Sequence, residues 1–254
     1  RRDQAHYRAL STVLSLNSSL QELSFEDLRF VDDPGTNVDC SPIFLAMGKN
    51  KVLKTLTLDS ASMEESLCTA MQNGLGTNAT LEHLSFLQVD MWDDTADLWH
   101  RAFSFLRTNH ALKSLKITLD PRVSESLVTA FRNDIVAMLQ ESESLESISV
   151  HSYHWIKTEE YIALVTVLQH NTTLKALDFF FREGLQQVTD AEDKQMAALL
   201  KKSYAMESLS GIDVESKAGD VGAILRLNQA GRRYLIEDGS SVSEGVKVLS
   251  AVRS

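Results

Sequence analysis

The chain has 254 residues, of which 43% are hydrophobic and 24% charged, and its formal net charge at pH 7 is −10. This length is ample for a sizeable core and amounts to one or two domains. No uninterrupted apolar run of about 18 residues occurs, which excludes a membrane-spanning helix. Three prolines and eleven glycines exclude a collagen-like or low-complexity chain.

The cysteines indicate the cellular compartment, and the charge distribution indicates the class of partner. Cys40 and Cys68 are too few for a disulfide framework and lack metal-ligand spacing, so we expect a reducing, cytoplasmic compartment and neither metal nor cofactor. Residues 61–180 hold 8 Lys and Arg against 16 Asp and Glu. This acidic middle disfavours sequence-independent nucleic-acid binding, and it favours either a basic partner protein or simply solubility.

One short pattern recurs from the N-terminal part onward: an asparagine, two residues, a leucine, two residues, a second leucine, one residue and an apolar side chain. Its six clear copies begin at Asn17, Asn50, Asn78, Asn109, Ser142 and Asn171, and two degraded copies begin at Ser203 and Asn228. Successive copies lie 25 to 33 residues apart. Three of these asparagines also begin N-glycosylation triplets, which we assign to the repeat itself.

Between the copies the apolar spacing changes to three and four residues, which predicts amphipathic helices. We expect helices over 4–16, 64–74, 98–106, 127–139, 161–168 and 241–254. Ser124, Thr158 and Thr189 stand at the expected helix starts as capping residues. Each repeat is therefore predicted to be a short strand, a loop and a helix that runs back.

Such units bury their apolar faces only by stacking, which places the strands in one parallel sheet and the helices opposite. Strands lie about 4.8 Å apart and helices about 10 Å, so the stack is expected to curve with the strands inside. The sequence predicts a single α/β horseshoe-shaped solenoid of about eight repeats over residues 1–254. Residues 210–254 are expected to hold degraded repeats or a C-terminal cap, and the chain is expected to be a fragment of a longer one.

The repeat resembles the leucine-rich repeat, specifically the long, helix-containing ribonuclease-inhibitor-like class, over roughly residues 5–237. That resemblance implies a parallel sheet on the concave face, helices on the convex face and a protein-binding role. One position departs from the class, which usually has Asn or Cys at the ninth repeat position. This chain has Leu28, Ala61, Val89, Asp120, Tyr153 and Arg182 there, so we expect no side-chain ladder and irregular loops after the strands.

Strand residues that alternate with the core leucines are expected to line the concave face. The first two rows are mostly small hydroxyls, whereas the third row carries apolar bulk from Leu87 onward. Exposed aromatic and apolar side chains are the usual anchors of protein binding. The predicted partner-binding residues are Leu87, Trp92, His151, Tyr153, Phe180 and Phe181.

Ser149, His151 and Asp178 share this face and have the residue types of a nucleophilic triad. Ser149 and His151 are two residues apart on one strand, about 6.5–7 Å, which is too far for a serine–base hydrogen bond on backbone spacing alone. Since no nucleophile elbow is present either, we predict no catalytic residues and no enzyme.

The leading functional prediction is a non-enzymatic scaffold that recognises a partner protein on the concave face and adjacent loops. Two alternatives remain open. One is the sensor or regulatory arm of a larger multidomain protein, and the more distant one is a hydrolase. The sequence carries no signal for an oligomeric state or for one particular partner.

Overall fold

The computed structural model describes residues 4–26, 41–60, 62–63, 65–91, 96–152, 163, 166–168, 170–181, 194, 198 and 208–210. Its helices are α1 (Gln4–Leu16), α2 (Ser41–Lys49), α3 (Glu65–Leu75), α4 (Ala96–Phe103) and α5 (Glu125–Glu141), with a 3₁₀ helix η1 (Ser104–Arg107) after α4. The strands are β1 (Glu22–Phe25), β2 (Thr55–Asp59), β3 (Ser62–Met63), β4 (His83–Met91), β5 (Ser114–Leu119), β6 (Ser147–Ser152), β7 (Ala176–Phe181) and β8 (Ser208–Ser210).

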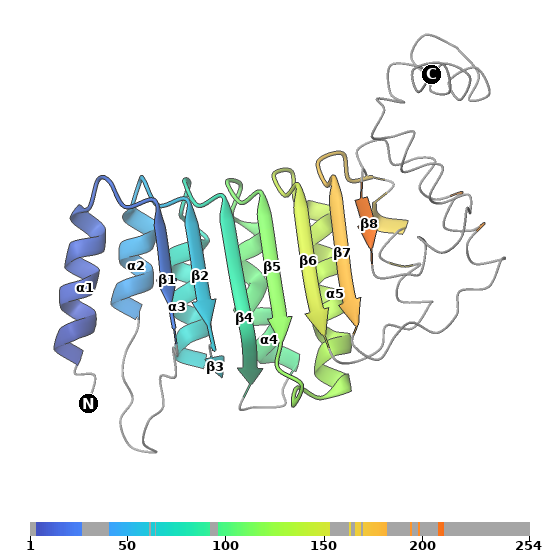
Figure 1. Ribbon diagram of the computed structural model, residues 1–254, viewed down its shortest axis with the longest axis horizontal. Helices are drawn as coiled ribbons and strands as arrows, with labels where there is room; N and C mark the ends of the chain where they lie inside the picture. The colour runs from blue at the N-terminus through green and yellow to red at the C-terminus, as the bar shows by residue number, and fades with distance from the viewer. Residues whose placement is uncertain are drawn as a thin grey trace, which may run out of the picture.

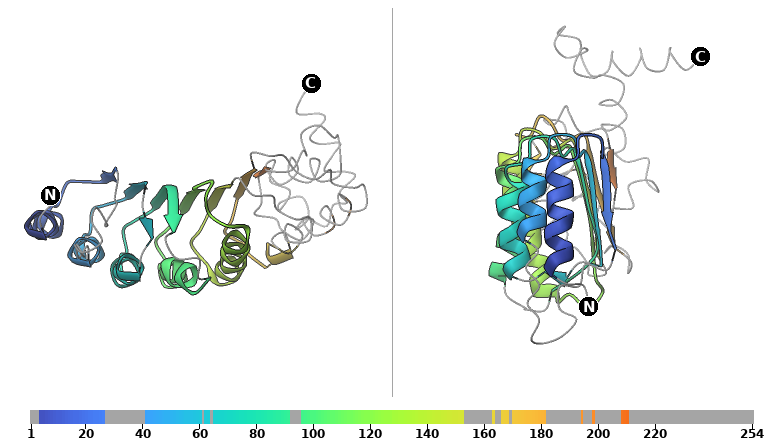
Figure 2. Two further views of the ribbon diagram at one scale, coloured as in Figure 1. Left: turned by 90° about the horizontal axis from the view of Figure 1, so that it is seen from below. Right: turned by 90° about the vertical axis from the view of Figure 1, so that its left-hand side faces the viewer.

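These elements form two layers (Figure 1). The strands make one eight-stranded sheet in the order β1-β2-β4-β5-β6-β7-β8, with β3 beside β4, and every pairing is parallel. The described helices pack side by side on one face of the sheet, and none of them covers the other face, which we call the open face. Figure 2 shows the two layers following a shallow arc with the strands on the inner side.

The structure therefore confirms the α/β class, the parallel sheet and the strand of each of the first seven copies. Helix α1 has the predicted bounds, and the helices predicted at 64–74, 98–106 and 127–139 correspond to α3, to α4 with η1, and to α5. Ser124 stands at the start of α5, but its side chain makes no capping hydrogen bond. The eighth copy, the helix predicted at 241–254 and the caps at Thr158 and Thr189 lie outside the described residues.

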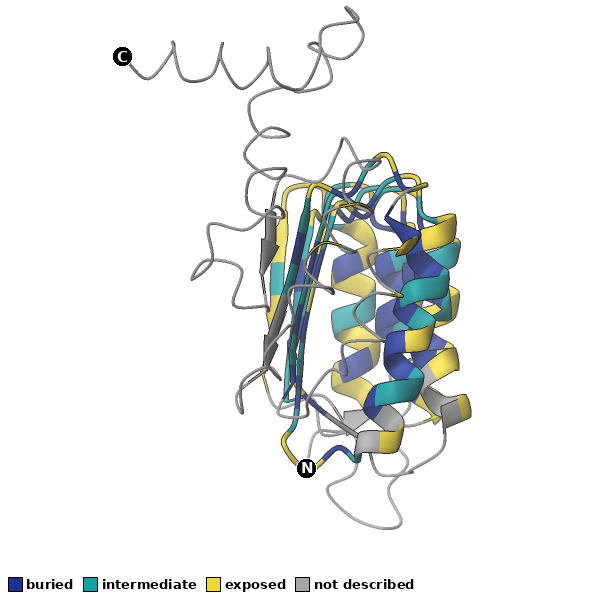
Figure 3. Ribbon diagram, turned by 90° about the vertical axis from the view of Figure 1, so that its right-hand side faces the viewer, coloured by how far each residue is buried: buried dark blue, intermediate teal, exposed yellow. Residues whose placement is uncertain are grey.

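The core lies between the two layers (Figure 3). The leucine positions of the second to the fifth copies are at most 2% exposed, because each strand points alternate side chains at the helices. Phe103 of α4 connects the layers, since its ring centroid lies 5.5 Å from that of Phe86 in β4 and 5.2 Å from that of Phe131 in α5. No helix in the described part of the chain is long and apolar enough to cross a membrane.

Four of the asparagines that begin a copy connect it to the previous repeat, an arrangement that we call the asparagine ladder: Asn50, Asn78, Asn109 and Asn171. The side chain of Asn78 is 3% exposed, and its amide nitrogen donates to the carbonyl oxygens of Met47 at 2.6 Å and Asn50 at 3.3 Å. Its amide oxygen accepts from the backbone N–H groups of Thr80 at 2.8 Å and Leu81 at 2.6 Å. Asn50, Asn109 and Asn171 make the same four contacts in their own repeats.

This ladder differs from the one considered in the sequence. The ninth position does lack Asn and Cys, and Val89 at that position is fully buried. The ladder lies instead at the opposite edge of the sheet, in the turns from helix to strand. There it satisfies carbonyls that the last turn of a helix leaves without intrahelical partners. Burial of Asn78 and Asn171, at 3% and 8% exposure, also supports assigning their glycosylation triplets to the repeat.

We expect Asn78→Ala to lower the free energy of unfolding by about 3 kcal/mol, because it leaves buried backbone groups without hydrogen-bond partners. Asn78→Ser should cost about half as much, since Ser142 replaces the asparagine in the fifth copy and its Oγ accepts from the N–H of Leu145 at 3.2 Å. Urea unfolding followed by circular dichroism measures both losses. Asn73→Ala, at an exposed position of α3, is the matched control and should be close to neutral.

A loss below about 1 kcal/mol for Asn78→Ala would show that the turn holds without its asparagine and that the ladder is not a stabilising element.

Candidate functional site

The strand register brings the predicted rows of the open face side by side. Each residue of the central row pairs with the next across the sheet: Ser24, Thr57, Ser85, Lys116, Ser149, Asp178 and Ser210. The row before it is likewise in register from Glu22 to Ser208. The first two rows therefore lie as the repeat predicts, with mostly small hydroxyl side chains along the inner side of the arc.

The third row is interrupted at Leu87 by a bulge in β4. Phe86 pairs with Ile117 and Val89 with Leu119, so two residues of β4 lie opposite the single Thr118 of β5. Gln88 adopts a left-handed backbone with φ of 54°, and Ser60 at the equivalent position after β2 has φ of 53°. Leu87 is half-buried on the open face, and β4 continues to Met91 where the sequence predicted an irregular loop.

The other predicted binding residues fall into two groups. His151 is one-third exposed and lies beside Phe180, its register partner on β7. Phe181 pairs with Ser152, which is buried on the side facing the helices. Phe181 is therefore the last residue of β7, not part of the loop in which the sequence placed it. Trp92 and Tyr153 lie outside the described residues.

Ser149, His151 and Asp178 meet on the open face, which corrects the distance argument made from the sequence. Ser149 Oγ lies 3.2 Å from His151 Nε2 and donates a hydrogen bond to Asp178 Oδ2 at 3.1 Å. His151 Nε2 lies 3.6 Å from the same carboxylate oxygen. The estimate considered the backbone spacing alone, whereas the two side chains lean toward each other and close the gap.

The contacts within this cluster are not those of a nucleophilic triad. In a triad the carboxylate holds the histidine nitrogen that faces away from the serine. Asp178 instead approaches the same Nε2 atom that faces Ser149, and it also accepts the serine hydroxyl proton. The cluster can donate and accept hydrogen bonds, and the Asp178 side chain, 45% exposed, presents a negative charge to solvent.

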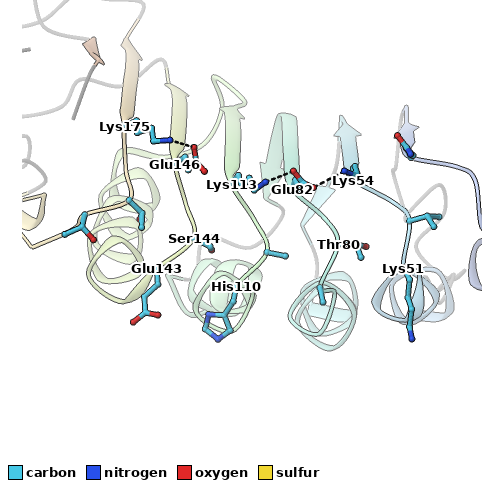
Figure 4. Close-up of a pocket in the computed structure, with 16 residues that line it drawn as sticks. Lys51, Lys54, Thr80, Glu82, His110, Lys113, Glu143, Ser144, Glu146 and Lys175 are labelled. Atoms are coloured by element: carbon cyan, nitrogen blue, oxygen red, sulfur yellow. Dashed lines mark hydrogen bonds and ion pairs between the residues drawn. The ribbon is translucent and has the colours of Figure 1, made fainter. Parts of the chain in front are cut away.

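A second feature was missed in the sequence and lies at the edge of the sheet where the strands begin. A groove of about 850 Å³ runs along the turns from helix to strand (Figure 4). Along this groove the position just before the strand alternates in charge from β2 to β7, a row that we call the lysine–glutamate ladder: Lys54, Glu82, Lys113, Glu146 and Lys175. The same alternation is present in the repeat alignment, so comparing that column across copies would have found it.

The ladder is held by ion pairs between neighbouring repeats. Glu82 receives Lys113 Nζ at 2.8 Å and Lys54 Nζ at 3.2 Å, one on each carboxylate oxygen, and Lys175 Nζ lies 2.7 Å from Glu146. The hydrogen bond from Lys113, with a smaller contribution from Lys54, lowers the pKa of Glu82 from 4.5 to about 2. The hydrogen bond with Glu82 in turn raises the pKa of Lys113. The groove thus carries charges that neutralise one another.

We expect the Glu82 carboxyl to titrate near pH 2, which a carbon-detected NMR titration of the glutamate side chains measures. Because its folded pKa lies below the ordinary value, any stability from this ladder is present above about pH 4.5 and is lost as the pH falls toward 2. Lys113→Gln should move the midpoint back toward 4.5, and so should high salt, since these side chains are solvent-exposed. A midpoint near 4.5 in the unaltered chain at low salt would show that these ion pairs do not form in solution.

No known family and no curated protein matches the chain. Among solved structures, the chain is similar to one titled as actin-binding site 2 of leiomodin-1, with 14% identity over 91% of this chain and 94% of that chain and a TM-score of 0.31. It is also similar to the tropomodulin C-terminal domain of Caenorhabditis elegans, with 12% identity over 92% of this chain and 99% of that chain and a TM-score of 0.29. At these scores neither likeness contributes to the inferences below, which rest on the residues of this chain.

Proposed function

We propose that this chain is a non-enzymatic protein-recognition module of the leucine-rich-repeat type, with about eight repeats curved into a horseshoe. Its partner is a protein, bound on the open face and the loops beside it in the cytoplasm, and binding needs no metal or cofactor. The observation that carries the proposal is the cluster of Ser149, His151 and Asp178 on β6 and β7, next to the position of Phe180.

The chemistry of this part of the open face suits a protein partner. The cluster offers hydroxyl, imidazole and carboxylate groups within 3.6 Å of one another. On the neighbouring strand β5, Lys116 pairs with Ser149 and Thr118 pairs with His151. Such groups adapt their hydrogen bonds to a partner, while a neighbouring apolar or aromatic side chain supplies most of the binding energy. Leu87 of β4 lies across β5 from His151 and adds an apolar side chain to this part of the open face.

Charge favours a basic partner. The chain has a net charge of −10, and the exposed carboxylate of Asp178 lies in the binding surface. An acidic surface steers basic partners and raises their association rate, an effect that salt weakens. The geometry of the cluster gives no support to hydrolysis, because the carboxylate and the serine face the same histidine nitrogen.

The proposal is tested by capturing partners from a lysate of the native source with the wild-type chain and a Phe180→Asp/His151→Glu double variant. Bound proteins are identified by mass spectrometry and their affinities measured with purified material. We expect the double variant to bind the true partner at least about tenfold more weakly, because it replaces an apolar anchor and adds negative charge to the open face.

The matched control is Gln72→Glu/Asn73→Asp, which makes the same change in formal charge at exposed positions of α3 on the helix side. Circular dichroism checks that all three chains fold alike. Equal binding by the wild type and the open-face variant would contradict the proposal and move recognition to the helices, loops or ends. A chain that captures nothing would favour the regulatory-arm alternative.

A further inference from the structure

The first repeat differs from every inner repeat in what it leaves exposed. Leu20 is 37% exposed, whereas its equivalents are at most 2% exposed: Leu53, Leu81, Leu112, Leu145 and Leu174. Val13 of α1 is 58% exposed although the same position is buried in all five following repeats, and Leu16 beside it is 78% exposed. The inner repeats have polar residues in place of Leu16. Helix α1 and strand β1 form the end of the stack (Figure 2), and this end therefore exposes apolar side chains at positions that are buried in the inner repeats.

Asn17 shows what this surface lacks. Its amide oxygen accepts from the N–H groups of Ser19 at 2.9 Å and Leu20 at 2.6 Å, as in the inner repeats. Its amide nitrogen meets no acceptor among the described residues, whereas that of Asn50 donates to the carbonyls of Leu14 and Asn17. Those acceptors are the last turn of the preceding helix and the preceding asparagine. Asn17 thus makes the two hydrogen bonds within its own repeat, but within the described part of the chain it lacks the two carbonyl acceptors that a preceding repeat would supply.

The backbone of β1, like the side chain of Asn17, lacks among the residues that the structure describes the partners that a preceding repeat supplies elsewhere in the stack. In the inner repeats, two N–H groups at the start of each strand donate to one carbonyl of the preceding repeat, as Lys54 and Thr55 do to Gln21 at 2.8 and 2.9 Å. Strand β1 pairs with β2 on one side, and its other edge faces outward at the end of the sheet. An exposed strand edge of this kind is a template for pairing.

We propose that the surface formed by α1, Asn17 and β1 docks one further strand–helix layer of the same repeat type, parallel to α1 and β1 and joined directly ahead of α1. Such a layer adds a parallel strand to the free edge, covers Val13 and Leu20, and brings the C-terminal carbonyls of its helix to the amide nitrogen of Asn17. The inference concerns a different surface from the open face and does not depend on the proposed function.

A second copy of the chain is a poorer match for the same surface. Two-fold pairing of β1 with its own copy runs the strands and helices antiparallel. It would bring the N-terminal end of the opposite α1, where the helix dipole is positive, toward the amide nitrogen of Asn17, which is itself a hydrogen-bond donor. The spacing in the sequence between the helix start and the asparagine also suits a preceding repeat joined directly to α1. Gln4 lies thirteen residues before Asn17, as Glu65 at the start of α3 lies thirteen residues before Asn78. A short connection like that from β2 to α3 therefore fits ahead of α1.

The test adds such a layer from the chain itself. Residues 41–64, which hold α2, β2 and the connection to the next helix, are fused directly before Gln4 of the full chain. The control fusion changes Leu53 and Leu56 of the added copy to aspartate, which keeps the length but prevents burial. We expect the first fusion to raise the thermal midpoint by at least about 3 °C over the control, since it buries the apolar end of the stack.

Asn17→Asp supplies the sharper readout, because it keeps the accepting oxygen and removes the donating nitrogen. In the unfused chain it should shift the midpoint little, whereas in the fusion it should lower the midpoint as much as Asn78→Asp does in the unfused chain. Equal effects of Asn17→Asp with and without the added layer would overturn the proposal, as would a fusion no more stable than its control.

Light scattering of the unfused chain over a range of concentrations tests whether a second copy of the chain occupies this surface instead. A monomer is the expected result. A dimer that dissociates on Leu16→Lys would assign this surface to a second copy and overturn the proposal.

Discussion

The buried asparagine amide at the head of four inner repeats, those of Asn50, Asn78, Asn109 and Asn171, is the interaction on which the rest of the structure depends. One planar group binds the last turn of the previous repeat's helix, the turn that follows that helix and two N–H groups just before its own strand. It therefore fixes where each strand starts relative to its neighbour. Every strand pairing from β1 to β8 follows this start, including the single shift at the β4 bulge, and the rows of the open face are its direct result.

The two functional features are consequences of this alignment. Because equivalent positions meet on adjacent strands, His151 and Ser149 of one strand face Asp178 of the next and form a compact polar cluster. The same alignment sets lysine beside glutamate at the edge, where Glu82 serves two lysines at once. On the open face, the carboxylate of Asp178 is exposed to a partner. In the lysine–glutamate ladder, by contrast, lysines and glutamates pair with one another.

Periodicity was sufficient to predict the strands, most helices and the leucine core, because these depend on positions that recur in each copy. It could not predict the bulge at Leu87 and Gln88, since a glutamine in a left-handed backbone gives no glycine or asparagine signal. The contact between Ser149 and His151 was excluded on backbone spacing, which ignores the reach of the imidazole. The role of Asn78 was overlooked because the family pattern drew attention to the ninth position instead.

Alternating charge along the edge has a consequence for how such a chain can change in length. From Lys54 to Lys175 the charge in this row changes sign from each repeat to the next. Duplication or loss of a single inner repeat would set two lysines or two glutamates on adjacent strands, about 4.8 Å apart, and would exchange an ion pair for repulsion. Gain or loss of two repeats together preserves the alternation. Uncharged Gln21 at the start of the row accepts a neighbour of either sign, so a single unit added at this end would leave the alternation intact.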